Sequence, residues 1–145
     1  MKAINEMKLT IESRSVNESF ARVTVSAFVA SLDPTLEEIS DIKTAVSEAV
    51  TNCIVHAYKN SMGRIYLWVG IFPDNSVKIR IRDRGCGIED IHKAMTPLYS
   101  SEPEERAGLG FAVMQSFCDK LSVRSTPGKG TTVTLLKKIE SRKSC

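Results

Sequence analysis

The sequence predicts an α+β fold, a two-layer sandwich of one mixed, mostly antiparallel sheet with helices on one face. Apolar residues recur at helical spacing over residues 15–32, 33–60 and 108–117. Apolar and polar residues alternate in five shorter segments, at residues 8–13, 64–72, 76–83, 121–124 and 131–136. Because a helix and a sheet each bury one apolar face, these elements are expected to pack as two layers.

The first predicted helix follows a strand in which Leu9, Ile11 and Ser13 alternate with polar residues. Ser15 and Glu18 have the spacing of a capping box, which predicts the helix start. The helix is apolar on two sides, with one flank of Val16, Phe20, Val23, Ala27 and Ala30 and another of Val25, Phe28, Val29 and Leu32. Such a helix packs either on its own core and on a partner, or as a core helix crossed by two elements.

The second predicted helix begins at Asp33-Pro34, because Pro is tolerated in a first helical turn. It is expected to end near residues 58–60. Its core face consists of Ile39, Ile42, Val46, Ala49, Val50, Cys53 and Ala57. Pro73-Asp74-Asn75 and residues 127–130 have the composition of turns, so two antiparallel hairpins are expected after this helix.

Regular patterning stops between Arg84 and Ala107. A short helix is expected around Ile88–Met95, and residues 96–107 are polar and contain two prolines. A long irregular loop in a small domain is typical of a functional lid, and a ligand is expected to enter there. No internal repeat or linker is visible, so residues 1–145 are expected to form a single domain.

The composition is that of a soluble globular chain, with 42% hydrophobic and 26% charged residues among 145. A net charge of +3 is too small to indicate a nucleic-acid surface, so no direct nucleic-acid partner is expected. No apolar run is long enough for a membrane span, and the first residues lack a signal-peptide core. The cysteines form no CxxC pair, which argues against zinc and disulfides and favours a cytoplasmic location; they are Cys53, Cys86, Cys118 and Cys145.

Glu48 and Asn52 form the first candidate site motif. They are one helical turn apart and therefore project from the same face. An amide oxygen suits Mg²⁺, which prefers oxygen ligands, and a carboxylate can accept the proton of an attacking hydroxyl or water. An exposed helix face has the same pattern, so this motif alone does not establish a functional site.

Two glycine-rich motifs follow. Asp83 ends a predicted strand ahead of Gly85 and Gly87, so its carboxylate could accept a hydrogen bond from an adenine amino group while the glycines let backbone approach the base. A surface turn has the same composition. The second motif is Gly108, Leu109 and Gly110 at a predicted helix start, where free N–H groups favour phosphate. Arg106, Ser100 and Ser101 precede it and could add charge and hydroxyl donors. Neither a Walker loop nor a Rossmann fingerprint is present.

In this order the motifs resemble the nucleotide site of the GHKL superfamily, which contains gyrase, Hsp90, histidine kinases and MutL, and this implies the Bergerat ATP-binding fold. The run from Ser47 to Asn52, followed by His56 and Tyr58, is similar to the anti-sigma-factor serine kinases of Gram-positive bacteria. Residues 17–25 are similar to the sporulation branch of that family, so the resemblance covers nearly the whole chain.

The resemblance implies a homodimer that binds and inhibits a sporulation sigma factor. It also implies a serine protein kinase that uses ATP and Mg²⁺, releases ADP, and phosphorylates and inactivates an anti-anti-sigma protein. By motif match, Glu48 is the general base, Asn52 the Mg²⁺ ligand, Asp83 the adenine contact and Arg22 a contact for protein partners. The residues implied to line the nucleotide are Gly85, Gly87, Ser100, Ser101, Arg106, Gly108, Leu109, Gly110 and Thr131.

Two departures from the family pattern affect the lid: Ala57 stands where relatives often have Gly, and Ser100-Ser101 where Thr pairs are common. Three other functions fit parts of the pattern. They are the ATP-binding domain of a histidine kinase, a nucleotide-gated binding module without catalysis, and a DNA-linked ATPase. The presence of Glu48 argues against a pure binding module, because such a module needs no base.

Overall fold

The computed structural model describes residues 1–59, 61–88, 90 and 109–140. In chain order the elements are β1 (Asn5–Glu12), α1 (Val16–Val29), the 3₁₀ turn η1 (Ala30–Leu32), α2 (Leu36–Asn52), the π-helical turn η2 (Cys53–Ala57), β2 (Arg64–Ile71), β3 (Ser76–Asp83), α4 (Leu109–Phe117), β4 (Lys120–Thr126) and β5 (Gly130–Lys138). The predicted helices and strands in this part of the chain are therefore present, with β1 starting three residues earlier than expected. The short helix expected near Ile88–Met95 and the lid at 96–107 lie outside the described residues.

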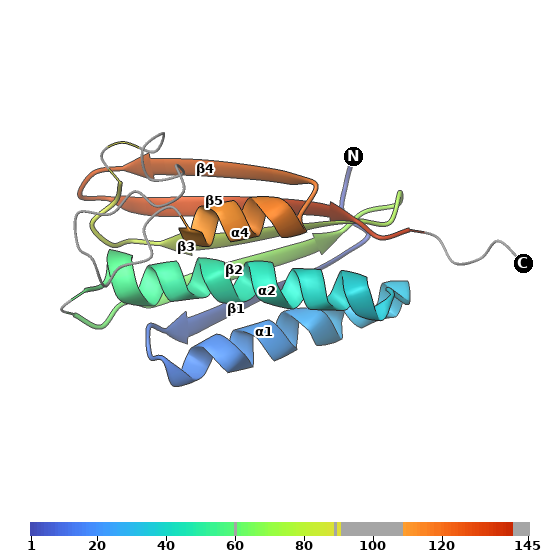
Figure 1. The fold of residues 1–145 in the computed structure, drawn as a ribbon, viewed down its shortest axis with the longest axis horizontal. Coiled ribbons are helices and arrows are strands. Elements are labelled where there is room, and N and C mark those ends of the chain that lie inside the picture. Colours follow the sequence, from blue (N-terminus) through green and yellow to red (C-terminus); the bar gives the residue numbers. More distant parts are fainter. Residues whose placement is uncertain (60, 89, 91–108, 141–145) are drawn as a thin grey trace, which may run out of the picture.

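The five strands form one sheet in the order β1-β2-β3-β5-β4, and every neighbouring pair is antiparallel. Helices α1, α2 and α4 all lie against the same face of this sheet (Figure 1). This arrangement confirms the predicted α+β sandwich with helices on one face, although the described sheet is wholly antiparallel rather than mixed. Among the described residues, no helix is both long and apolar enough to span a membrane.

The pairing of β3 with β5 is what positions the site. β2–β3 and β4–β5 are hairpins, as the turn compositions predict. β3 and β5 also pair, although α4 and β4 lie between them in the sequence. Their register places Asp83 directly opposite Thr131 at one end of the sheet. Two residues that are far apart in sequence therefore become neighbours on adjacent strands.

The core lies between the sheet and the helices. Its largest fully buried side chains include Ile42, Val46 and Val50 from α2, Ile65, Val69 and Ile81 from the sheet, and Met114 from α4. Each such side chain contributes roughly 1.5–3 kcal/mol through burial. The predicted core face of α2 is confirmed for Ile42, Val46, Ala49, Val50 and Cys53, which are buried, whereas Ile39 and Ala57 are only half-buried.

The two apolar flanks of α1 have different environments. Val25 and Val29 are completely buried, and they belong to the flank that packs into the core. The opposite flank is open, with Val16 72%, Phe20 52% and Val23 56% exposed. The alternative in which α1 is a core helix crossed on both sides is therefore wrong for this chain, because no described element covers the second flank.

The capping box predicted at Ser15 and Glu18 is also wrong. Ser15 makes no side-chain cap, because its backbone is already helical (φ −59°, ψ −32°), and the Glu18 carboxylate bonds elsewhere. A capping box is present instead at the start of α2, where Thr35 Oγ1 accepts from the Glu38 amide at 3.0 Å and Glu38 Oε1 accepts from the Thr35 amide at 2.8 Å. Asp33 and Pro34 precede the helix that they were expected to open.

The face of the sheet away from the helices carries a line of cations stacked on aromatic rings. The guanidinium of Arg80 lies 4.9 Å from the centroid of Trp68 on the neighbouring strand. The guanidiniums of Arg82 and Arg84 lie 5.1 and 5.0 Å from the Tyr66 ring. Tyr66 and Trp68 therefore pack against arginines rather than in the core.

Candidate nucleotide site

Glu48 and Asn52 face the start of α4. They lie on the last two turns of α2, which packs against α4. A Cβ placed on Gly110 would lie 3.0 Å from Asn52 Oδ1 and 3.4 Å from Glu48 Oε2. A Cβ at these distances would be a tight contact, so glycine lets the first turn of α4 come this close without displacing either side chain. The structure therefore brings together the first and third sequence motifs, although they are more than fifty residues apart.

Asp83 lies at the end of β3 with 5% of its surface exposed. Its Oδ1 atom accepts hydrogen bonds from the Gly85 amide at 2.9 Å and the Thr131 amide at 3.2 Å. Its Oδ2 atom accepts from the Cys53 thiol at 3.5 Å. A carboxylate oxygen has more than one lone pair, so Oδ2 can still accept a donor from a ligand.

Burial raises the pKa of Asp83 above its ordinary range, and the hydrogen bonds from Gly85, Cys53 and Thr131 oppose that rise. The pKa of the Cys53 thiol is raised well above its usual value, first because the thiol is buried and then because the Asp83 charge is close. Cys53 consequently remains a protonated donor to Oδ2 at neutral pH. The site thus holds a carboxyl group in a poorly solvated position at the end of a strand.

The loop after Asp83 is clamped from two sides. The Cys86 amide donates to the Ala57 carbonyl at 3.2 Å, at the end of the π-helical turn. On the other side, the Gly128 amide donates to the Cys86 carbonyl at 2.6 Å and the Ile88 amide donates to Ser125 Oγ at 2.7 Å. The loop therefore runs between the end of η2 and the β4–β5 hairpin.

The glycines of this loop are required by the protein itself. Gly87 has a φ of 76°, which L side chains rarely adopt, and a Cβ there would overlap the Thr126 carbonyl. A Cβ on Gly85 would overlap the Ala57 carbonyl. The sequence suggested that these glycines allow close approach to an adenine base. The structure adds a second reason for them, which is the packing of the loop against η2 and the β4–β5 hairpin.

Thr131 is 8% exposed and belongs to the same network. Its hydroxyl lies 2.8 Å from Ser125 Oγ, and these two residues are opposite each other on β5 and β4. Sequence reasoning predicted Thr131 but missed Ser125 and Cys53 as members of the site. Ser125 sits in an ordinary strand pattern and Cys53 on an ordinary core face, so no local signal could have identified either of them.

Several of the predicted lining residues cannot be placed. Ser100, Ser101, Arg106 and Gly108 lie outside the described residues. Leu109 and Gly110 are the first two residues of α4, as the predicted helix start requires.

The residues present suit an ATP–Mg²⁺ pair. The described part of the chain has no group of three or more His, Cys, Asp and Glu side chains that could hold a metal ion unaided. Mg²⁺ needs no such group, because it is usually bound by one or two protein oxygens together with waters and substrate phosphates. The Asn52 amide oxygen borders the first turn of α4, where backbone N–H groups favour phosphate. The donor set therefore fits a metal bound jointly by the protein and a nucleotide.

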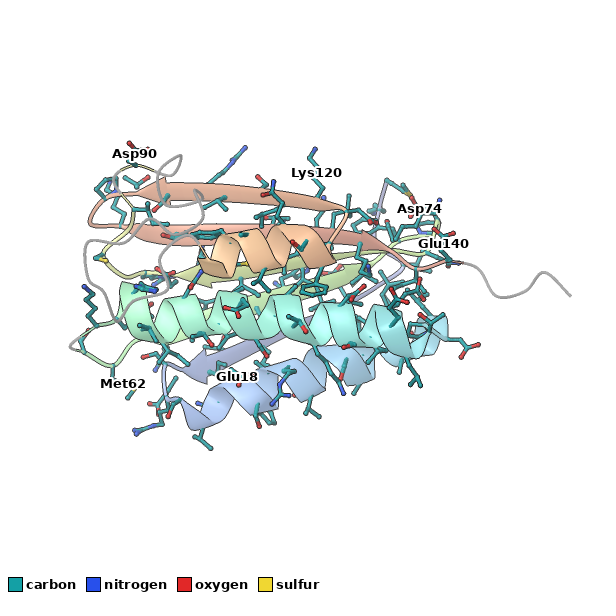
Figure 2. All side chains as sticks on the ribbon, viewed as in Figure 1. Glu18, Met62, Asp74, Asp90, Lys120 and Glu140 are labelled. Carbon is teal, nitrogen blue, oxygen red and sulfur yellow. The ribbon has the colours of Figure 1, made fainter. Side chains whose placement is uncertain are left out.

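Arg22 lies on α1 at the border with α2. Its Nε donates to Glu18 Oε2 at 3.1 Å, and the same oxygen accepts from Ser47 Oγ at 2.7 Å. Figure 2 shows Glu18 on α1 where that helix runs beside α2. Ser47 precedes Glu48 in sequence, so the candidate partner contact Arg22 is linked through two side chains to the helix that carries Glu48.

The profile of the histidine kinase-like ATPase domain matches residues 11–137. The chain belongs to this family. Solved structures share the fold at low identity: the RsbU and RsbW domains of Rv1364c from Mycobacterium tuberculosis are 20% identical with a TM-score of 0.70, over 93% of this chain and 32% of that chain. The mycobacterial sensor histidine kinase MprB is 13% identical with a TM-score of 0.58, over 91% and 100%.

Other relatives are much more similar in sequence. The anti-sigma F factor of Caldanaerobacter subterraneus subsp. tengcongensis is 60% identical over 136 residues, which cover 93% of this chain and 94% of the relative. The anti-sigma F factor of Thermoanaerobacter sp. strain X514 is 58% identical over 144 residues, which cover 99% and 100%. The resemblance to GHKL anti-sigma factors seen in the sequence motifs is thus confirmed over nearly the whole chain.

Proposed function

We propose that this protein is an anti-sigma factor that also acts as an ATP- and Mg²⁺-dependent serine protein kinase. It binds and inhibits a sporulation sigma factor, and it phosphorylates and thereby inactivates an anti-anti-sigma protein. The observation that carries the proposal is the convergence of Glu48 and Asn52 on Gly110 at the start of α4. The names of the relatives at 58–60% identity support a sigma factor as the partner that is inhibited.

Adenine recognition is assigned to the end of β3. The amino group of the base donates to Oδ2 of Asp83, while Oδ1 is held by the Gly85 and Thr131 amides. Because Oδ1 is already held by the backbone, the carboxylate is oriented before the nucleotide arrives. Pre-orientation of this kind lowers the entropy cost of binding.

Phosphoryl transfer is assigned to α2 and the start of α4. Asn52 holds Mg²⁺ through its amide oxygen, and the metal when bound neutralises phosphate charge. Glu48 accepts the proton of the substrate serine hydroxyl as that oxygen bonds to the γ-phosphorus and the bond from phosphorus to the ADP oxygen breaks. Little covalent chemistry is asked of the protein, since this transfer depends mainly on positioning and charge.

The open flank of α1 is assigned to protein partners, including a second copy of the chain. Val16, Phe20 and Val23 are each more than half exposed, and such an apolar group on a small domain is typical of an interaction surface. Arg22 lies beside this flank and contributes a charged contact. The protein is accordingly proposed to be a homodimer of single-domain subunits.

The test is a transfer assay with radiolabelled ATP, Mg²⁺ and a candidate anti-anti-sigma protein, with wild type beside Glu48→Gln. We expect label on a partner serine, and a rate on the order of 10²–10⁴-fold lower in the variant, because a general base is removed while the shape is kept. Calorimetry should show that the variant still binds ATP. Equal rates in the two proteins would reject Glu48 as the base, and acid-labile label on a histidine would favour the histidine-kinase alternative.

A further inference from the structure

We propose that Tyr58 is a positioning residue for adenine recognition, in that its hydroxyl sets the place of Asp83. This inference rests on the proposed nucleotide site. Tyr58 follows the π-helical turn η2, and its side chain is 9% exposed. Its hydroxyl donates to the Arg64 carbonyl at 2.7 Å and accepts from the Arg84 amide at 2.7 Å. Arg84 is the residue directly after Asp83.

The Tyr58 hydroxyl replaces a backbone hydrogen bond between β2 and β3. β2 and β3 pair as far as Ile65 and Asp83, and the next pair in the same register would be Arg64 with Arg84. The carbonyl of Arg64 and the amide of Arg84 meet the Tyr58 hydroxyl instead of each other. The strands therefore separate at this point, and the chain leaves the sheet into the loop that follows Asp83.

The ring that carries this hydroxyl is itself fixed. A Cβ on Gly63 would overlap the Tyr58 ring, so the ring packs directly on the backbone at that glycine. The Tyr58 amide donates to the Cys53 carbonyl at 3.1 Å, which ties the residue to the π-helical turn. Burial raises the pKa of the Tyr58 phenol, so it remains a donor to Arg64 throughout the neutral range. The position of the hydroxyl is thus determined by α2, η2 and Gly63 together.

The expected consequence for function is limited to recognition of the adenine ring. Tyr58 touches neither Glu48 nor Asn52 through any described hydrogen bond, and its hydroxyl acts on the backbone beside Asp83. Removing the hydroxyl lets Arg64 and Arg84 rearrange, which moves the carboxylate that receives the adenine amino group. The phosphate end of the site on α2 and α4 is unaffected. The loss therefore falls on nucleotides that have the amino group.

The experiment compares wild type, Tyr58→Phe and the control Tyr66→Phe with two nucleotides, ATP and inosine triphosphate, which lacks the amino group. We expect Tyr58→Phe to raise the KM and Kd for ATP about three- to thirtyfold, in line with the loss of one or two hydrogen bonds, and to leave kcat unchanged. Affinity for inosine triphosphate should stay at the wild-type value. Tyr66→Phe, whose ring stacks on the open face, should behave as wild type.

Gly63→Ala provides a second variant, because it displaces the ring rather than removing the hydroxyl. It should also lower affinity for ATP more than affinity for inosine triphosphate. Wild-type ATP affinity in Tyr58→Phe would overturn the role, and so would equal losses for the two nucleotides, which indicate a general structural effect. A wild-type protein that binds neither nucleotide would overturn the proposed function itself, and this result appears before any variant is compared.

Discussion

At the scale of single residues, Asp83 combines two opposing requirements. In its proposed role it accepts a hydrogen bond from adenine, for which the charged carboxylate is the stronger acceptor, yet burial disfavours that charge and raises its pKa. The backbone amides of Gly85 and Thr131 and the Cys53 thiol compensate only in part. The folded protein without nucleotide therefore holds a carboxylate at some cost in stability, as is common at functional sites.

Replacing Asp83 by Asn tests this cost. The folded pKa is raised above the ordinary 3.8, so the carboxyl is neutral in both states below pH 3.8 and no difference arises there. As pH rises towards the raised pKa, the unfolded chain loses its proton first and wild type loses stability. We therefore expect Asp83→Asn to gain free energy of unfolding relative to wild type with rising pH and then to level off.

Urea unfolding at intervals from pH 4 to 7 measures this difference, and calorimetry should show that the same variant no longer binds ATP. A wild-type advantage that grows with pH would mean that the folded pKa is lowered instead. Wild-type ATP affinity in the variant would separate Asp83 from adenine recognition.

At the scale of elements, two helix starts with the same sequence pattern behave differently. Ser15 and Thr35 each precede a Glu by three residues, but only Thr35 has an extended backbone (φ −69°, ψ 163°) and a complete capping box. The difference arises because Glu18 is engaged by Arg22 and Ser47, a contact with the neighbouring helix. A local pattern predicts a cap only where tertiary contacts leave its side chains available.

Thr35→Ala should therefore cost more stability than Ser15→Ala. Loss of an N-cap hydrogen bond typically costs about 0.5–2 kcal/mol, whereas a substitution that removes no such bond usually stays within about 0.5 kcal/mol. The free energy of unfolding in urea, measured for both variants beside wild type, checks the difference. Equal costs in the two variants would show that the capping hydrogen bond of Thr35 adds no measurable stability.

At the scale of the whole molecule, the sheet order makes the site. β3 and β5 are adjacent although α4 and β4 come between them in sequence, and this pairing places Asp83 beside Thr131. On the other layer, α2 packs against α4, which places Glu48 and Asn52 at Gly110. Figure 1 shows these two layers with α2 and α4 over the central strands.

The periodicity of the chain was sufficient to predict the helices, the strands and the layering, whereas the motif residues were predicted from their spacing and from the resemblance to the GHKL family. It could not predict Cys53, Ser125 or the hydroxyl of Tyr58 as parts of the site, because each acts on a residue that only the tertiary fold brings near. The Tyr58 hydroxyl, for example, meets a backbone amide twenty-six residues away. The sequence periodicity also allowed two environments for the second flank of α1, and only the tertiary packing shows that this flank is exposed.

We propose that α2, α4 and the end of β3 form one site for nucleotide and Mg²⁺. The most direct test of this proposal is calorimetric titration of ATP, with and without Mg²⁺, into wild type and Asn52→Ala. We expect wild type to bind ATP more tightly when Mg²⁺ is present, and Asn52→Ala to lose that dependence because it lacks the amide oxygen beside Gly110. Unchanged Mg²⁺-dependent binding in Asn52→Ala, or no binding of ATP by wild type, would contradict a shared nucleotide and Mg²⁺ site.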